Sequence, residues 1–116
     1  MSLPSIWYVL DAERRPVPVD IETWGRFFEH EPNRIVGMTQ ITSEVEVSTV
    51  FLGLDHGLWR DGPPILFETM IFGGPLDQCQ WRYVSWDDAE VGHQAAVRKA
   101  REAIGQRVNE AKTNVD

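Results

Sequence analysis

The sequence predicts an α+β fold, in which an antiparallel sheet of about four to five strands carries two helices packed on one face. Two observations lead to this prediction. Short runs of β-branched and aromatic residues follow one another across turns, which is typical of hairpins. Two other segments, one near the start and one at the end, repeat apolar residues at helical spacing. With 116 residues, the chain has the length of one domain, and we expect residues 1–116 to form it.

The first third of the chain predicts a strand, a turn and a helix. Residues 6–10 are a short β-prone run, and residues 11–18 form a turn whose two prolines would restrict any strand there to a sheet edge. Asp20 is a suitable N-cap. Pro32 is expected to end the helix, because the residue before a proline avoids the α region. The apolar residues of this helix are Ile21, Trp24, Phe27 and Phe28.

The middle of the chain predicts four extended runs, at residues 34–41, 44–54, 65–72 and 80–84. The first two are joined by a bend at Thr42 and Ser43. A loop rich in glycine and proline separates the second run from the third, and a Gly-Gly-Pro sequence closes the third. The last two runs are expected to form an antiparallel hairpin with a loop longer than the tightest turns.

The final segment predicts a long helix that begins at Ser85. Asp88 follows three residues later, in the arrangement of a capping box with Asp in place of Glu. One side of the helix carries mostly small apolar residues, so we expect it to lie close against the sheet. This stripe comprises Ala89, Ala96, Val97, Ala100, Ile104 and Val108, with His93 set inside it.

The net charge of −7, from 18 acidic and 11 basic side chains, argues against general binding to nucleic acid or to anionic membranes. Five tryptophans are many for this length, which favours a homo-oligomer, such as a homodimer, or a protein partner. Cys79 is the only cysteine, so a cysteine-based zinc site is excluded, and no metal or cofactor is predicted. With no signal peptide or apolar membrane span visible, we expect a cytoplasmic protein.

Glu68 is the most informative single residue, because it lies among apolar residues in the third run. Burial of a carboxylate costs several kcal/mol unless the group is paired. Arg82 is the expected partner. If Phe72 faces Gln80 in the hairpin, Arg82 lies diagonal to Glu68 and within reach. A structural ion pair is the simplest interpretation. The alternative is a catalytic, ligand-binding or interface role for Glu68, and Arg82, like Asp55, is a candidate for binding a ligand.

Three further residues are candidates for acid–base or ligand chemistry. Asp55 and His56 directly follow a strand, where they form either an ordinary turn or a carboxylate–imidazole pair. His93 is either a hydrogen-bonded core residue or part of a pocket shared with Glu68 or His56. Two histidines and one carboxylate would suit a metal in principle, but their spacing does not require one.

Four stretches together resemble a group of short uncharacterised proteins encoded in bacteriophages and bacterial prophage regions. They run from Ser48 to His56, from Leu66 to Gly74, from Trp81 to Tyr83 and from Ser85 to His93, about half of the chain. The resemblance implies a phage-related, cytoplasmic protein and no particular activity.

Two functions of different classes therefore remain. The first is a small acidic phage- or prophage-related accessory protein that acts as a non-enzymatic interaction module. The second is a small metal-dependent hydrolase or small-ligand binder that uses Glu68, His56 and His93. The two differ in whether these three side chains converge in one pocket.

Overall fold

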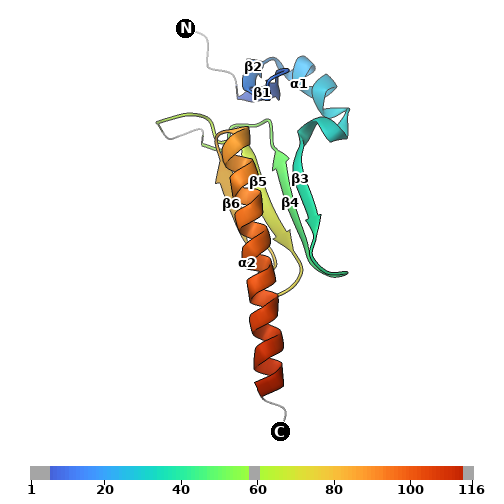
Figure 1. The fold of residues 1–116 in the computed structure, drawn as a ribbon. Helices are drawn as coiled ribbons and strands as arrows, with labels where there is room; N and C mark the ends of the chain where they lie inside the picture. Colours follow the sequence, from blue (N-terminus) through green and yellow to red (C-terminus); the bar gives the residue numbers. More distant parts are fainter. Residues whose placement is uncertain (1–5, 58–60, 114–116) are drawn as a thin grey trace.

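The computed structural model describes residues 6–57 and 61–113, without the side chains of residues 31, 33 and 107–113. It confirms the α+β class. A four-stranded antiparallel sheet carries a long helix on one face, and a two-stranded sheet with a short helix lies at one end (Figure 1). The elements are β1 (Trp7–Leu10), β2 (Pro16–Val19), α1 (Ile21–Phe28), the 3₁₀ turn η1 (Glu31–Arg34), β3 (Ile35–Gln40), β4 (Glu46–Phe51), β5 (Phe67–Phe72), β6 (Gln80–Tyr83) and α2 (Trp86–Thr113).

The N-terminal hairpin differs from the prediction, because residues 16–18 belong to a strand and not to a turn. β1 and β2 form their own antiparallel sheet, in which Pro18 lies opposite Tyr8. The N–H of Asp11 donates to the C=O of Arg15 at 3.0 Å. Hydrogen-bonded and non-hydrogen-bonded residue pairs alternate along an antiparallel ladder, so Tyr8 and Pro18 form a non-hydrogen-bonded pair. The ring nitrogen of Pro18 therefore points away from β1. A two-stranded sheet consists only of edges, so its prolines interrupt no hydrogen bond.

Both helices begin at the predicted caps. The Asp20 carboxylate accepts the N–H of Thr23 at 2.8 Å, and the hydroxyl of Ser85 accepts the N–H of Asp88 at 3.1 Å. Backbone hydrogen bonding lowers the pKa of Asp20, which is consistent with its role as a charged cap. α1 ends at Phe28, and the 3₁₀ turn that contains Pro32 follows.

The four-stranded sheet is a meander with the order β3-β4-β5-β6, each strand antiparallel to the next. The bend between β3 and β4 lies where it was predicted. The hydroxyl of Thr42 accepts the N–H groups of Glu44 and Val45, both at 3.1 Å. β3 carries a bulge between Ile35 and Gly37, which changes its register with β4.

One face of this sheet is covered by α2 and is buried. It contributes alternate residues of β4 and β5, namely Val47, Thr49, Phe51, Phe67, Thr69 and Ile71, each of which is 0% exposed. The predicted stripe of α2 is confirmed, with Ala89, His93, Ala96, Val97 and Ala100 buried. The side chain of Val108 lies outside the described residues. α2 extends past the end of the sheet (Figure 1).

The short helix α1 covers the end of the same core. Its Phe27 and Phe28 rings contact the Phe51 ring, with centroids 6.1 and 6.0 Å apart. The indole N–H of Trp24 donates to the C=O of Gly53 at 3.0 Å. Within residues 6–57 and 61–113, no helix combines the length and hydropathy that a membrane crossing needs.

Candidate functional site

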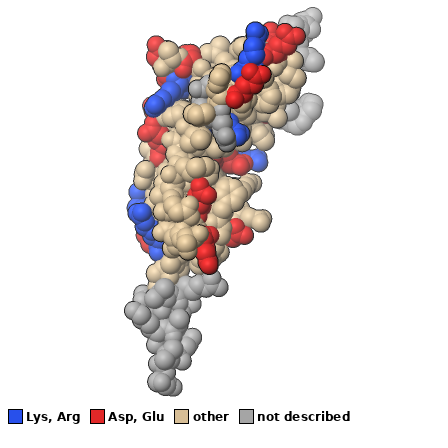
Figure 2. Space-filling model, turned by 90° about the vertical axis from the view of Figure 1, so that its right-hand side faces the viewer, with Lys and Arg blue, Asp and Glu red and all other residues tan. Residues whose placement is uncertain are grey.

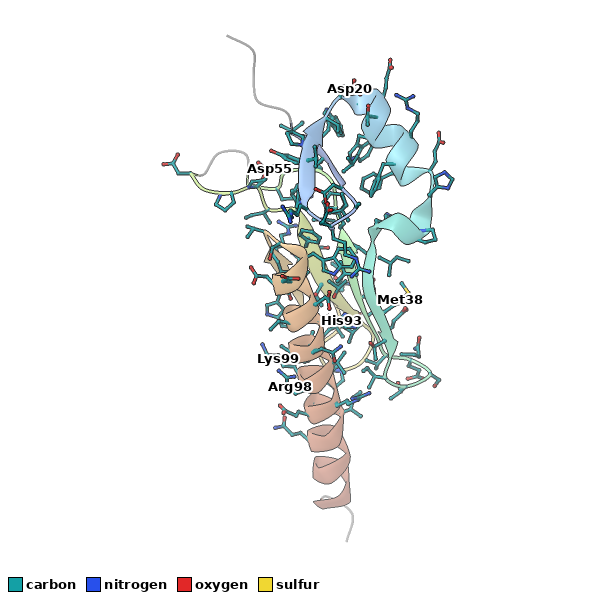
Figure 3. The ribbon with its side chains drawn as sticks, turned by 45° about the horizontal axis from the view of Figure 1, so that its top comes forward. Asp20, Met38, Asp55, His93, Arg98 and Lys99 are labelled. Carbon is teal, nitrogen blue, oxygen red and sulfur yellow. The ribbon has the colours of Figure 1, made fainter. Side chains whose placement is uncertain are left out.

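The structure does not bring the three predicted catalytic candidates together. Glu68 belongs to the sheet face that α2 leaves uncovered, because its neighbours Phe67 and Thr69 point into the core. His93 lies on the opposite face, between α2 and the sheet (Figure 3). His56 is exposed in the loop that follows β4. Among the described residues, no group of three His, Cys, Asp or Glu side chains could hold a metal ion.

Glu68 pairs with Arg82, as predicted. The Nε–H of Arg82 donates to a Glu68 carboxylate oxygen at 3.0 Å. The register differs by two residues from the expected one, because Gln80 faces Met70 and Arg82 lies directly opposite Glu68. The Arg82 side chain is 40% exposed and that of Glu68 is 15% exposed, so the pair lies at the surface.

Asp55 has a structural contact that accounts for its position. Its carboxylate accepts the N–H groups of Gly57 at 2.8 Å and of Ile65 at 3.1 Å. The backbone of His56 donates to the C=O of Ile65 at 3.0 Å. These contacts fix the two ends of the loop between β4 and β5, in agreement with the turn interpretation.

His93 belongs to a buried chain of hydrogen bonds. Its Nδ1 lies 2.7 Å from the hydroxyl of Thr49, which lies 2.6 Å from the hydroxyl of Thr69. Its Nε2 lies 2.8 Å from the hydroxyl of Thr39. A neutral imidazole has one N–H, so one of the two threonines that contact the ring must donate and the other must accept. Because burial disfavours the charged ring, the pKa of His93 is lowered.

Two glycines make room for this arrangement. A Cβ on Gly37 would lie 3.1 Å from Cδ2 and Nε2 of His93, closer than side chains normally approach. A Cβ on Gly92 would overlap the Tyr83 ring. The Gly92-His93 pair is therefore explained by close packing between α2 and the sheet.

A groove runs between β3 and α2, and we call it the β3–α2 groove. It has a volume of about 250 Å³ and is lined by residues 36–39 of β3 and by Glu90, His93 and Gln94 of α2. A larger cavity of about 500 Å³ adjoins it, shares Val36 and Glu90, and extends to Arg14 and Trp86. Glu90 thus lies where both hollows meet.

Glu90 is held by two neighbours. The indole N–H of Trp86 donates to its carboxylate, and an Arg14 nitrogen lies 3.9 Å from the same oxygen. The guanidinium of Arg14 lies over the Trp86 ring, 4.5 Å from its centroid. The Arg14 and Glu90 side chains are 63% and 55% exposed, so this ion pair is weak.

The sequence prediction missed the groove and its residues. One signal was present for α2, since Glu90 lies four residues after Trp86 and three before His93, spacings that place side chains along one side of a helix. For Thr39 the signal was weaker, a hydroxyl in an apolar strand. For Arg14 there was none, because its contact with Trp86 depends on the tertiary position of the N-terminal hairpin.

The uncovered face of the four-stranded sheet is the second candidate surface. It presents the exposed side chains of Met38 (57%) and Phe72 (48%) and the half-buried Val50 and Met70. The ion pair of Glu68 and Arg82 lies on the same face, beside Val50.

Comparisons with protein-family models, with curated proteins and with solved structures found no match to this chain.

Proposed function

We propose that this chain is a non-enzymatic interaction module that forms a homodimer through the uncovered face of its four-stranded sheet. The observation that carries the proposal is the exposure of apolar side chains on that face, above all Met38 at 57% and Phe72 at 48%. Exposed apolar side chains that are grouped on one surface mark interaction sites.

The charges of this face suit a second copy of the same chain. A two-fold axis brings one patch against itself, so an unpaired charge near the axis would meet a like charge. Arg82 neutralises Glu68 within the face, which limits this repulsion although the chain carries a net charge of −7. The half-buried Glu46 is the one acidic side chain described on β4, and it lies next to Phe72.

The size of the face sets the expected strength of the dimer. Three strands of six residues and one of four, about 4.8 Å apart, cover roughly 350 Å². A standard interface buries about 800 Å² on each partner. We therefore expect a weak dimer whose population depends on protein concentration.

The biological role that we propose is that of a phage- or prophage-related accessory protein in the cytoplasm. Its support is the sequence resemblance, which covers most of β4 and β6, all of β5 and the start of α2. The separation of Glu68, His56 and His93 favours this role over a hydrolase built on those three residues.

Sedimentation velocity over a dilution series tests the dimer, with Phe72→Asp as the disruptive variant. Val91 is 71% exposed on α2, away from the uncovered face of the sheet. Val91→Asp is therefore a matched control, because it also replaces an exposed apolar side chain by an aspartate. We expect the parent and Val91→Asp to dimerise at high concentration and Phe72→Asp to stay monomeric. A parent that is monomeric at every concentration, or a Phe72→Asp variant that dimerises like the parent, would overturn the proposal.

A further inference from the structure

Beyond the bulge between Ile35 and Gly37, the outer edge of β3 lacks the usual protection of an edge strand. β3 is an outer strand of the four-stranded sheet, and its sequence Ile-Val-Gly-Met-Thr-Gln contains no charged residue and no proline. Natural sheets commonly protect such edges with charges, prolines or very short strands. The opposite outer strand, β6, has only four residues and contains Arg82. Figure 2 views the molecule from the side of β3, where uncharged surface separates scattered acidic and basic side chains.

The register identifies the backbone groups that face outward. The N–H of Ile41 donates to the C=O of Val45 at 2.8 Å, so these two residues form a hydrogen-bonded pair. Hydrogen-bonded and non-hydrogen-bonded pairs alternate along the ladder, and Thr39, two positions before Ile41, therefore bonds to Val47 of β4. The N–H and C=O groups of Met38 and Gln40 consequently point away from β4, toward the open edge.

The β3–α2 groove lies beside this edge and has the size of a side chain. Its volume is about 250 Å³. A cavity of about 150 Å³ accommodates benzene, so this groove can hold one long side chain but is too small for a helix. Strand addition uses this combination, in which the edge binds a peptide backbone and a pocket accepts alternate side chains.

The charge of the groove favours a basic side chain. Glu90 is the charged residue that lines it, and His93 is held neutral by burial, which lowers its pKa. Among the described residues, the basic group that pairs with Glu90 is Arg14, whose nitrogen lies 3.9 Å from the carboxylate and whose side chain is well exposed. Trp86 and Arg14 both contact the same carboxylate oxygen of Glu90, which leaves the other oxygen for a lysine.

A second copy of this chain is a poor occupant of the same site. Pairing of two β3 strands would offer only uncharged side chains to Glu90, because β3 contains no basic residue. The other outer strand, β6, has one basic residue, Arg82, which already pairs with Glu68. A foreign segment that alternates apolar residues with a lysine meets both requirements of the edge and the groove.

We propose that the edge of β3 and the β3–α2 groove bind an extended segment of a partner protein, which joins the sheet as an added strand and places a basic side chain beside Glu90. This site uses the edge of β3, whereas the proposed dimer uses the uncovered face of the sheet. Met38 contributes its outward backbone N–H to the first and its exposed side chain to the second.

Fluorescence anisotropy with a defined probe tests the proposal. The probe is a labelled peptide Thr-Val-Thr-Lys-Thr-Val-Thr, whose valines and lysine fall on one side of the strand. The control peptide carries Glu in place of Lys. Met38→Pro removes an outward N–H, and Met38→Ala removes the same side chain but keeps that N–H. Glu90→Gln removes the charge in the groove and keeps an acceptor for Trp86, with Glu102→Gln on the same helix as its control.

We expect the lysine peptide to bind the parent at least about tenfold more tightly than the glutamate peptide, a difference of about 1.4 kcal/mol. Met38→Pro should weaken its binding by about tenfold or more, while Met38→Ala stays within about twofold of the parent. Glu90→Gln should reduce the preference for lysine, and Glu102→Gln should not. Equal binding by Met38→Pro and Met38→Ala would overturn the proposal, as would a parent that binds neither peptide. Circular dichroism of each variant establishes that it is folded.

Discussion

The two faces of the four-stranded sheet are built from alternate residues of the same strands, yet they satisfy their polar groups differently. On the face covered by α2, a chain of short hydrogen bonds without a charge links Thr69, Thr49, His93 and Thr39 in that order. On the uncovered face, Glu68 and Arg82 form an ion pair at the surface. A polar residue in an apolar strand can therefore be interpreted only when its face is known. Glu68 stood out more in the sequence. In the structure, however, Thr49 and Thr69 are fully buried and hydrogen-bonded, whereas the ion pair of Glu68 is partly exposed.

The largest effect that we predict is the loss of the covered face by Ala96→Arg. Ala96 is 1% exposed between α2 and the sheet, so a guanidinium there would be buried without a partner. Its free energy of unfolding should fall by about 3–5 kcal/mol. Thermal melts by circular dichroism measure this change. Val91→Arg, at an exposed position of the same helix, serves as the control and should melt close to the parent. A small shift for Ala96→Arg would contradict the assigned face of α2.

The sequence predicted this covered face well because its signals are local. The helical period of the stripe, the cap at Ser85 and the alternation of β4 need no long-range information. The prediction was wrong for residues 16–18, since the prolines that usually exclude a strand are harmless in a sheet made only of edges. The register of β5 with β6 was missed by two residues because the length of a hairpin loop does not determine pairing by itself.

The candidate sites were less predictable than the fold. Glu68 and Arg82 could be paired because a shift of two residues keeps both on one face. The partners of His93 lie 54 and 44 residues away, and they depend on how α2 crosses the sheet. The β3–α2 groove depends on the same crossing and on the absence of a side chain at Gly37. Such features arise from tertiary packing and have no local pattern.

A second, smaller effect is a pH dependence of stability that arises from His93 on the covered face. Burial lowers the pKa of His93 below its ordinary value of 6.5, so the unfolded chain binds a proton more readily than the folded protein. Well above pH 6.5 both states hold a neutral imidazole, and the contribution of His93 to stability is complete. As the pH falls below this value toward the folded-state pKa, stability is lost, by at most about 1.4 kcal/mol per pH unit.

Melting temperatures of the parent, His93→Gln and His56→Gln between about pH 7.5 and about pH 5 measure this effect. His93→Gln removes the buried imidazole, so its melting temperature should fall less over this range than that of the parent. His56→Gln removes an exposed imidazole and should follow the parent. If His93→Gln and the parent lose stability in parallel, the buried ring does not supply the pH dependence of the covered face.

The smallest effect concerns the ion pair on the uncovered face, and a double-mutant cycle isolates it. Glu68→Gln leaves the Arg82 guanidinium without its counter-charge, but that side chain is 40% exposed and water replaces much of the lost interaction. We therefore expect a coupling free energy of about 0.3–1 kcal/mol from the parent, Glu68→Gln, Arg82→Met and the double variant. The coupling should decrease in concentrated salt, because an exposed pair is screened.

If Glu68 is instead a functional carboxylate, Glu68→Gln should leave stability unchanged or raise it. Melts of the four proteins at a concentration where the parent is monomeric separate this coupling from association. A coupling above about 2 kcal/mol would place the pair in a poorly hydrated site and remove the contrast between the two faces.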